Sequence, residues 1–179
     1  MTEQHYSSPA DRANVTSEPE EVEKVNDLLD GFDVAMVTTV DSDSAEGRLT
    51  SRPLSTQEAR EDGVVLFLVR GSSAIAKDIE ANPNVNVAYS SMKAWVSLSG
   101  TAEIVEDPAL VAELWSAGAE MFMDGGPEDP DNRVMRVTGE TAAYWGGESL
   151  VATVVKTIKT ITGRGQEKDE EGGTTVVEL

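Results

Sequence analysis

Basic side chains that could bind an anionic ligand are unevenly distributed along this chain. Residues 94–132 contain neither Lys nor Arg, whereas the preceding part contains Arg48, Arg52, Arg60, Arg70, Lys77 and Lys93. Arg52 stands out because it precedes the strand-disrupting Pro53 and lies among the hydroxyl residues Thr50, Ser51, Ser55 and Thr56. This pattern suggests phosphate binding at Arg52. The alternative is a surface arginine that offsets acidic neighbours.

A second candidate for anion binding is the small-residue loop at residues 71–73. The sequence Gly-Ser-Ser precedes a short predicted helix, and free amide groups at a helix N-terminus can bind phosphate. The loop lacks the glycine spacing and the Lys-Ser/Thr pair of a Walker loop. We therefore favour a plain helix cap, with a phosphate cradle as the alternative.

The chain has almost no histidine or cysteine that could act in catalysis or bind a metal. The single histidine, His5, lies in a polar, aperiodic leader, and there is no cysteine. Catalytic triads, thiolate nucleophiles and zinc sites are therefore disfavoured. The acidic group Asp124, Glu128, Asp129 and Asp131 lacks EF-hand spacing, so we expect a solvated loop in place of a metal site.

Charge and length restrict the class of protein. The 33 acidic and 14 basic residues give a formal net charge of -19, which opposes binding to nucleic acid or to an anionic membrane. No apolar run approaches the ~20 residues of a membrane span, and we expect a cytoplasmic protein. We expect a disordered leader at residues 1–16, one domain at residues 17–162, and an acidic linker with a possible terminal strand at residues 163–179.

The elements that must position these residues are mainly strands. Apolar and alternating patterns predict strands at residues 32–40, 48–56, 63–69, 85–89, 94–105 and 133–145, and helices at residues 17–31, 74–80, 107–122 and 149–162. On the alternating strand 94–105, Trp95 falls on the polar face and needs cover from a ligand, a helix or a second subunit. The absence of regular βαβ alternation favours a mainly β protein with an antiparallel barrel.

Several short segments carry a family resemblance in the order in which they occur, from about Glu20 to Trp145. They are Ser-Arg-Pro-Leu at 51–54, Leu-Phe-Leu-Val at 66–69, Ser-Ala at 73–74, and the runs at 78–85, 96–103 and 144–145. Together they resemble the general stress protein branch of the FMN-binding split barrels, relatives of pyridoxamine 5′-phosphate oxidase. The resemblance implies a six-stranded antiparallel split β-barrel with flanking helices. It also implies a homodimer with FMN in two clefts between the subunits.

The resemblance also implies where the flavin would bind. Its ring would lie along the backbone of Pro53, Leu54 and Ser55. Leu68 and Val69 would follow the flavin and ribityl chain, and Val69 replaces a usual Thr. Trp95 would contact the flavin, and Trp145 would be lent by the partner subunit.

At the phosphate end the resemblance implies contacts from Arg52 and Ser73. Ile75 stands where the family has a phosphate-binding Lys, and Lys77 lies about 200° further round the helix. Loss of one charge-assisted contact is worth roughly 1.5–3 kcal/mol, so FMN binding is expected to be weakened, shifted or lost.

We expect a flavin-dependent oxidoreductase acting on an unidentified small molecule, with the flavin supplying the chemistry that His and Cys would otherwise perform. One alternative is a non-catalytic flavin- or ligand-binding stress or sensor dimer, and another is a split barrel that uses a deazaflavin or no cofactor. Pyridoxamine phosphate oxidation itself is disfavoured, because the arginine-histidine substrate motif of that enzyme is not found after Trp145.

Overall fold

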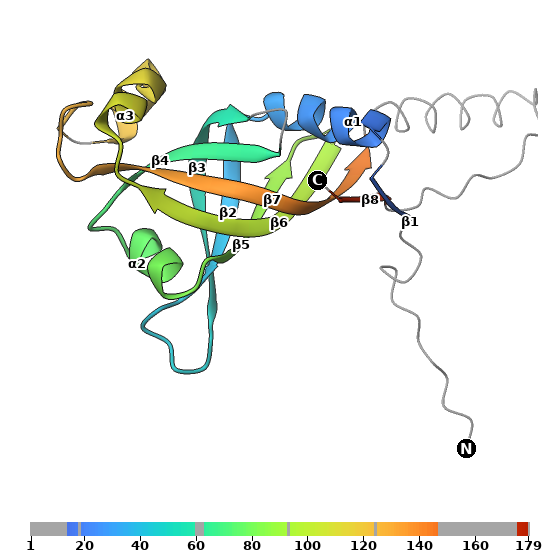
Figure 1. Cartoon of the computed structure of the whole chain (residues 1–179), viewed down its shortest axis with the longest axis horizontal. Coiled ribbons are helices and arrows are strands. Elements are labelled where there is room, and N and C mark those ends of the chain that lie inside the picture. The colour runs from blue at the N-terminus through green and yellow to red at the C-terminus, as the bar shows by residue number, and fades with distance from the viewer. Residues whose placement is uncertain are drawn as a thin grey trace, which may run out of the picture.

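A closed antiparallel barrel forms the body of the protein in the computed structural model, which describes residues 14–17, 19–59, 63–92, 94–123, 125–146 and 175–178. Six strands follow one another round the barrel in the order β7-β4-β3-β2-β5-β6, and β6 pairs with β7 to close it. They are β2 (Val34–Val40), β3 (Leu49–Ala59), β4 (Val64–Arg70), β5 (Asn84–Ser90), β6 (Ala94–Val105) and β7 (Asn132–Gly146). Figure 1 shows this barrel with helices at its ends and sides. The predicted six-stranded split barrel is confirmed.

Two short strands extend the sheet beyond the barrel. β8 (Thr175–Glu178) pairs antiparallel with β7 at residues 141–144, and β1 (Asn14–Thr16) pairs parallel with β8. The first lies inside the possible terminal strand that the sequence predicts. β1 lies inside the leader expected at residues 1–16. A leader strand of three residues has no periodicity of its own and is ordered by its pairing with β8.

Within the described ranges, four helices flank the barrel: α1 (Pro19–Asp30), α2 (Ala74–Ala81), α3 (Pro108–Leu114) and α4 (Ala117–Phe122). The predicted single helix over residues 107–122 is therefore wrong. Trp115 ends α3 in an extended conformation, and the Ser116 hydroxyl accepts a hydrogen bond from the Ala119 amide to cap α4. The helix predicted at residues 149–162 lies outside the described residues. No helix in the described ranges is long and apolar enough to cross a membrane.

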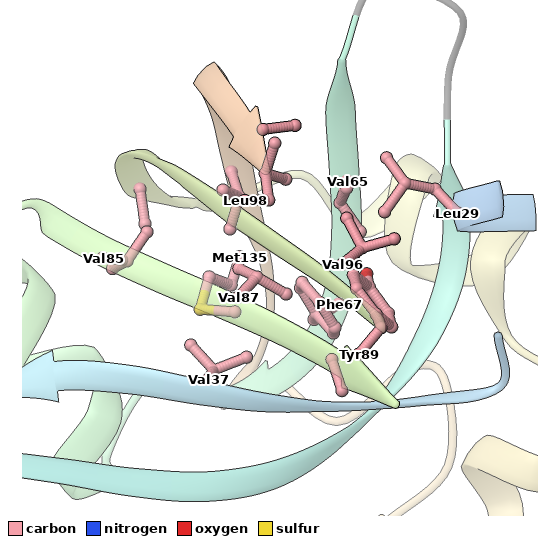
Figure 2. Close-up of a cluster of buried hydrophobic side chains, with 14 of the residues drawn as sticks. Leu29, Val37, Val65, Phe67, Val85, Val87, Tyr89, Val96, Leu98 and Met135 are labelled. Carbon is pink, nitrogen blue, oxygen red and sulfur yellow. The ribbon is translucent and has the colours of Figure 1, made fainter. Parts of the chain in front are cut away.

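Side chains from alternate positions of the strands fill the barrel. Figure 2 shows residues of five strands, including Val37, Phe67, Val87, Leu98 and Met135, converging with Leu29 of α1. A smaller cluster on the outside of β4 and β7 includes Leu66, Leu68 and Val134, which pack against α3 and α4. β4 is thus covered on both faces, which explains why its sequence is apolar without alternation. The remaining outer face of the barrel has no such helix cover among the described residues.

Candidate functional site

Arg52 lies in a polar cluster at the end of the barrel that α2 covers. Its direct partner on β2 is the buried Val37, so its side chain starts on the inner face of the sheet. Arg52 Nη1 lies 3.0 Å from Asp78 Oδ2 and donates to Thr39 Oγ1 at 2.9 Å. The Thr39 hydroxyl donates in turn to Asp78 Oδ2 at 2.8 Å. Arg52, Thr39 and Asp78 form a closed triangle, which we call the Arg52 cluster.

The carboxylate of this cluster is buried but well supplied with donors. Asp78 is 2% exposed, and its Oδ1 accepts a hydrogen bond from the Ser42 amide at 2.9 Å. Burial alone would raise the pKa of Asp78, but the hydrogen bonds from Ser42, Thr39 and Arg52 outweigh it and hold the pKa below its usual value. Asp78 is therefore ionised at neutral pH. The Arg52 side chain is 27% exposed, so the guanidinium still reaches solvent.

The loop at residues 71–73 is closed by a carboxylate of the chain itself. Asp131 accepts hydrogen bonds from the Ser72 amide at 2.9 Å, the Ser72 hydroxyl at 2.6 Å and Arg70 Nε at 2.9 Å. Arg70 also lies 3.5 Å from Asp129. The hydrogen bond from the Ser72 hydroxyl is the main cause that lowers the pKa of Asp131. The acidic side chain occupies the position that a phosphate cradle would need, so the loop acts as a cap.

The other residues expected at the phosphate end face in different directions. Ser73 caps α2, since its hydroxyl accepts from the Ala76 amide at 3.4 Å and donates to the Arg70 carbonyl at 2.5 Å. Ile75 is buried in the barrel core, whereas Lys77 is exposed on the outer side of α2. Position 75 therefore serves packing in this chain. Of the residues predicted at the phosphate end, Arg52 and Lys77 keep a cationic group in contact with solvent.

β3 separates from β4 next to Arg52. Its ladder with β4 runs from Ala59 to Thr56, with a bulge between Thr56 and Glu58, and no ladder pair joins residues 49–55 to any described strand other than β2. Pro53 has no N–H, and the Ser55 carbonyl accepts from Gln57 Nε2 at 3.2 Å. The Pro53 carbonyl and the Ser55 amide are therefore the backbone groups that this edge offers to a ligand at residues 53–55. The unpaired edge borders the Arg52 cluster.

The outer face of the barrel carries a set of exposed apolar side chains. Trp95 and Trp145 are direct partners across β6 and β7, and a neighbouring row runs from Pro53 through Met36 and Ala88 to Ser97. Val34, Met36, Trp95 and Trp145 are 55%, 43%, 45% and 41% exposed. We call the side chains of Val34, Met36, Pro53, Ala88, Trp95 and Trp145 the tryptophan face. It brings Pro53 onto the same surface as both tryptophans.

The remaining predicted residues lie in packed regions. Leu54 packs against the barrel core, to which Val69 belongs, while Leu68 lies in the outer cluster beneath α3 and α4. The side chains of Leu54, Leu68 and Val69 are therefore packed in apolar clusters, and these residues could contact a ligand only through their backbone. The structure places Arg52, Ser73 and Lys77 at or beside α2 and places Pro53, Trp95 and Trp145 on the tryptophan face.

A cavity of about 530 Å³ adjoins this region at the β3 bulge. Its lining consists of Asp33, Ser55, Thr56, Gln57, Glu58, Glu113, Leu114, Trp115 and Ser116. Ser116 Oγ donates to Gln57 Oε1 at 3.2 Å, which joins β3 to the junction of α3 and α4. Three carboxylates and no basic side chain occur among these lining residues. The cavity is therefore unsuited to an anionic group and suited to a small neutral or cationic molecule.

Asp78 and Thr39 are the residues of this site that sequence reasoning missed. A signal was present, because Asp78 falls on the same helical face as Ile75 and Ile79, where an acid would be buried. A buried carboxylate requires a partner, and that requirement points to a basic residue elsewhere in the chain.

Known proteins match this chain over most of its length. Residues 20–169 match the family model described as pyridoxamine 5′-phosphate oxidase like. Protein bli-3 of Neurospora crassa is 32% identical over 152 residues, which cover 77% of this chain and 72% of that protein.

Solved structures of bacterial proteins share the fold. The General Stress Protein 26 of Bacillus anthracis str. Sterne is 25% identical with a TM-score of 0.61, and the match covers 70% of this chain and 93% of that one. The general stress FMN/FAD binding protein of Xanthomonas citri is 24% identical with a TM-score of 0.59, covering 72% and 90%.

Proposed function

The chain belongs to the pyridoxamine 5′-phosphate oxidase-like family, and from that premise we propose that it is a cytoplasmic, homodimeric flavin-binding protein of the general stress type. We propose FMN as the flavin and an oxidoreductase activity on a small molecule. The names of the bacterial structures, one of which is an FMN/FAD binding protein, support a flavin.

One observation carries the proposal: the unpaired edge of β3 at residues 49–55 lies directly beside a partly exposed arginine. A flavin mononucleotide needs backbone donors and acceptors for its ring and a cation for its phosphate. The Ser55 amide and the Pro53 carbonyl supply the first and Arg52 supplies the second. These residues fit the flavin. Bound FMN would supply transfer of electrons or hydride, which no side chain of this chain provides by itself.

The tryptophan face supports a homodimer. Four large apolar side chains lie exposed on one surface, although most of the barrel's apolar groups are buried. Trp95 is proposed to contact the flavin of its own subunit and Trp145 that of the partner.

Replacement of Met36 by Glu is expected to shift the protein to monomers in sedimentation analysis. Met121→Glu is the matched control, because Met121 is also exposed but lies on α4, away from this face.

We place the small-molecule partner in the cavity beside Ser55. Because Asp33, Glu58 and Glu113 line it, an anionic partner is disfavoured there. In the proposed reaction the protein binds and orients the flavin and the small molecule, and the flavin would supply the chemistry.

A non-catalytic flavin-binding or sensing dimer is the second candidate. It is favoured by the phosphate end, where Ile75 is core, Ser73 is a cap and Asp131 closes the adjacent loop. Fewer donors for phosphate imply weaker binding than in a site with a lysine at position 75. A deazaflavin in place of FMN fits the same observation.

The test begins with the visible spectrum of the purified protein and an FMN titration. Arg52→Lys, which keeps a cation beside Asp78, is expected to weaken FMN binding about tenfold by loss of hydrogen-bond geometry. Arg48→Ala is the control, since Arg48 lies on the same hairpin but its side chain is 73% exposed and lies outside the Arg52 cluster. Absence of any flavin band and of saturable binding would contradict the proposal. Reduction of bound FMN by NADH or NADPH separates the enzyme from the non-catalytic binder.

A further inference from the structure

We propose that Asp78 is a positioning residue, which fixes the direction in which Arg52 presents its free N–H groups to a phosphate. The inference rests on the proposed function, because the phosphate in question is that of FMN. It extends that function by assigning a role to a buried carboxylate on α2 that does not reach the ligand itself.

The first step is the number of acceptors at one nitrogen. Arg52 Nη1 faces both Asp78 Oδ2 at 3.0 Å and Thr39 Oγ1 at 2.9 Å. Two acceptors from two different elements, α2 and β2, hold one end of the guanidinium. An arginine side chain has many rotamers in solution, and this pair of contacts selects one of them before any ligand arrives.

The second step is what remains free on the guanidinium. Nε and Nη2 of Arg52 make no hydrogen bond or ion pair with any residue in the described ranges, while the side chain is 27% exposed. Their N–H groups therefore point away from Asp78, on the solvent side of the cluster. A planar guanidinium held at one nitrogen presents the other two in a fixed fork, which matches the oxygens of a phosphate.

The third step is the rigidity of the anchor. Asp78 is 2% exposed, it accepts from the Ser42 amide and the Thr39 hydroxyl, and its helix is capped by Ser73. The carboxylate cannot turn away without leaving three donors unpaired. Asp78 also reduces the net charge near Arg52, which alone would weaken anion binding. We assign the larger effect to orientation, because the carboxylate lies on the buried side and hydrogen-bond geometry acts at short range.

The test compares FMN with riboflavin, which differ only by the phosphate. Asp78→Asn keeps the shape of the side chain, and it is expected to weaken FMN binding about tenfold while riboflavin binding stays unchanged. Thr39→Val should lower the FMN preference about threefold and serves as a second variant where Asp78→Asn folds poorly. Glu103→Gln is the matched control, since it removes a carboxylate that pairs with Arg136 outside the cluster, and it should leave the preference unchanged.

Two results would overturn the positioning role. Tighter FMN binding by Asp78→Asn would mean that Asp78 acts mainly by neutralising Arg52. Equal weakening of FMN and riboflavin would mean that it acts only on the fold.

A readout without flavin separates this inference from the proposed function. The Nη1–H signals of Arg52 in ¹⁵N NMR are expected to be resolved and slowly exchanging in the wild type, because Asp78 and Thr39 hold Nη1, and to broaden in Asp78→Asn. The same signal in both proteins would overturn the positioning role even where FMN binds. Wild-type protein that binds neither flavin, with the signal difference intact, would overturn the proposed function and the phosphate role while leaving the orientation of Arg52 by Asp78 established.

Discussion

Two arginine–carboxylate clusters lie beside α2, the Arg52 cluster on its inner face and the Arg70 cluster at its start. Both contain the same residue types, but they differ in whether the arginine can still bind an anion. In the Arg52 cluster, one arginine faces one buried carboxylate. In the other, one arginine, Arg70, faces two partly exposed carboxylates, Asp129 and Asp131. The first leaves N–H groups free beside the split in the barrel. The second leaves an excess of negative charge and closes the loop at residues 71–73.

The difference teaches that the ratio of carboxylates to arginines, and the depth of burial, decide what such a cluster can do. Asp131 takes the Ser72 amide and hydroxyl as well as Arg70, so that loop cannot receive a phosphate. Asp78 takes donors from inside the protein and leaves Arg52 directed outward. A basic residue in a sequence is therefore a candidate anion site only once its carboxylate partners are known.

The largest expected effect comes from removing the arginine of each cluster in turn. Arg52→Ala leaves Asp78 buried without its cation, and we expect the free energy of unfolding to fall by about 3 kcal/mol. Arg70→Ala should cost far less, because its carboxylates can turn to water. Urea denaturation at pH 7 measures both. Equal losses would break the distinction between the clusters.

A lysine at position 75 tests the buried face of α2. Ile75→Lys places a charged group among core side chains one helical turn from Asp78. We expect the free energy of unfolding to fall by about 2 kcal/mol. The loss is limited because the apolar stem of the lysine still packs in the core. Lys77→Ile is the control, because position 77 is exposed. If thermal unfolding of Ile75→Lys matched that of the wild type, position 75 would not be a core position.

The pH dependence of stability distinguishes Asp78 from an ordinary surface acid. Its folded pKa lies below the unfolded value, so the stability it contributes is complete above about pH 5 and is lost as the pH falls through the folded pKa. Asp78→Asn should lower the free energy of unfolding by about 1.5 kcal/mol at pH 7, and this difference from the wild type should shrink below about pH 4. Melting curves from pH 2 to 7 measure it. A difference that is independent of pH would contradict an ionised Asp78.

The smallest effect is expected from the carboxylate of the second cluster. Asp131→Asn keeps one acceptor oxygen, which can serve the Ser72 amide, and Asp129 still faces Arg70. The melting temperature should change less than in Asp78→Asn, and it should become less sensitive to added salt. A larger drop than in Asp78→Asn would reverse the order of the two clusters.

The barrel could be predicted from sequence because its strands carry local signals. Alternation in residues 94–105 and the apolar run at 64–69 are properties of neighbouring residues, and they predict strands without knowledge of the partner strand. The split barrel was expected from the family resemblance, and Pro53, which has no N–H, predicted an edge or a bulge in its strand. The break between α3 and α4 was missed, because Ser116 lies inside a run that is otherwise compatible with one helix.

The clusters could not be predicted from the sequence because their members are far apart in the chain. Asp131 reaches Ser72 across 59 positions and Asp78 reaches Thr39 across 39 positions. No local pattern states which of the many acidic residues will meet which arginine. The identity of Arg52 as a candidate could be read from its neighbours, whereas the carboxylate that holds it required the fold.

The pairing of β1 with β8 has a consequence for how the chain folds. Asn14 is the partner of Thr175, so this seam joins residues from nearly opposite ends of the sequence. Contacts of such long sequence separation carry a large loop-closure cost and form after the local hairpins of the barrel. We therefore expect the seam to be the last part of the sheet to assemble and the first from which amide protons exchange, while the barrel behind it remains closed by β6 and β7.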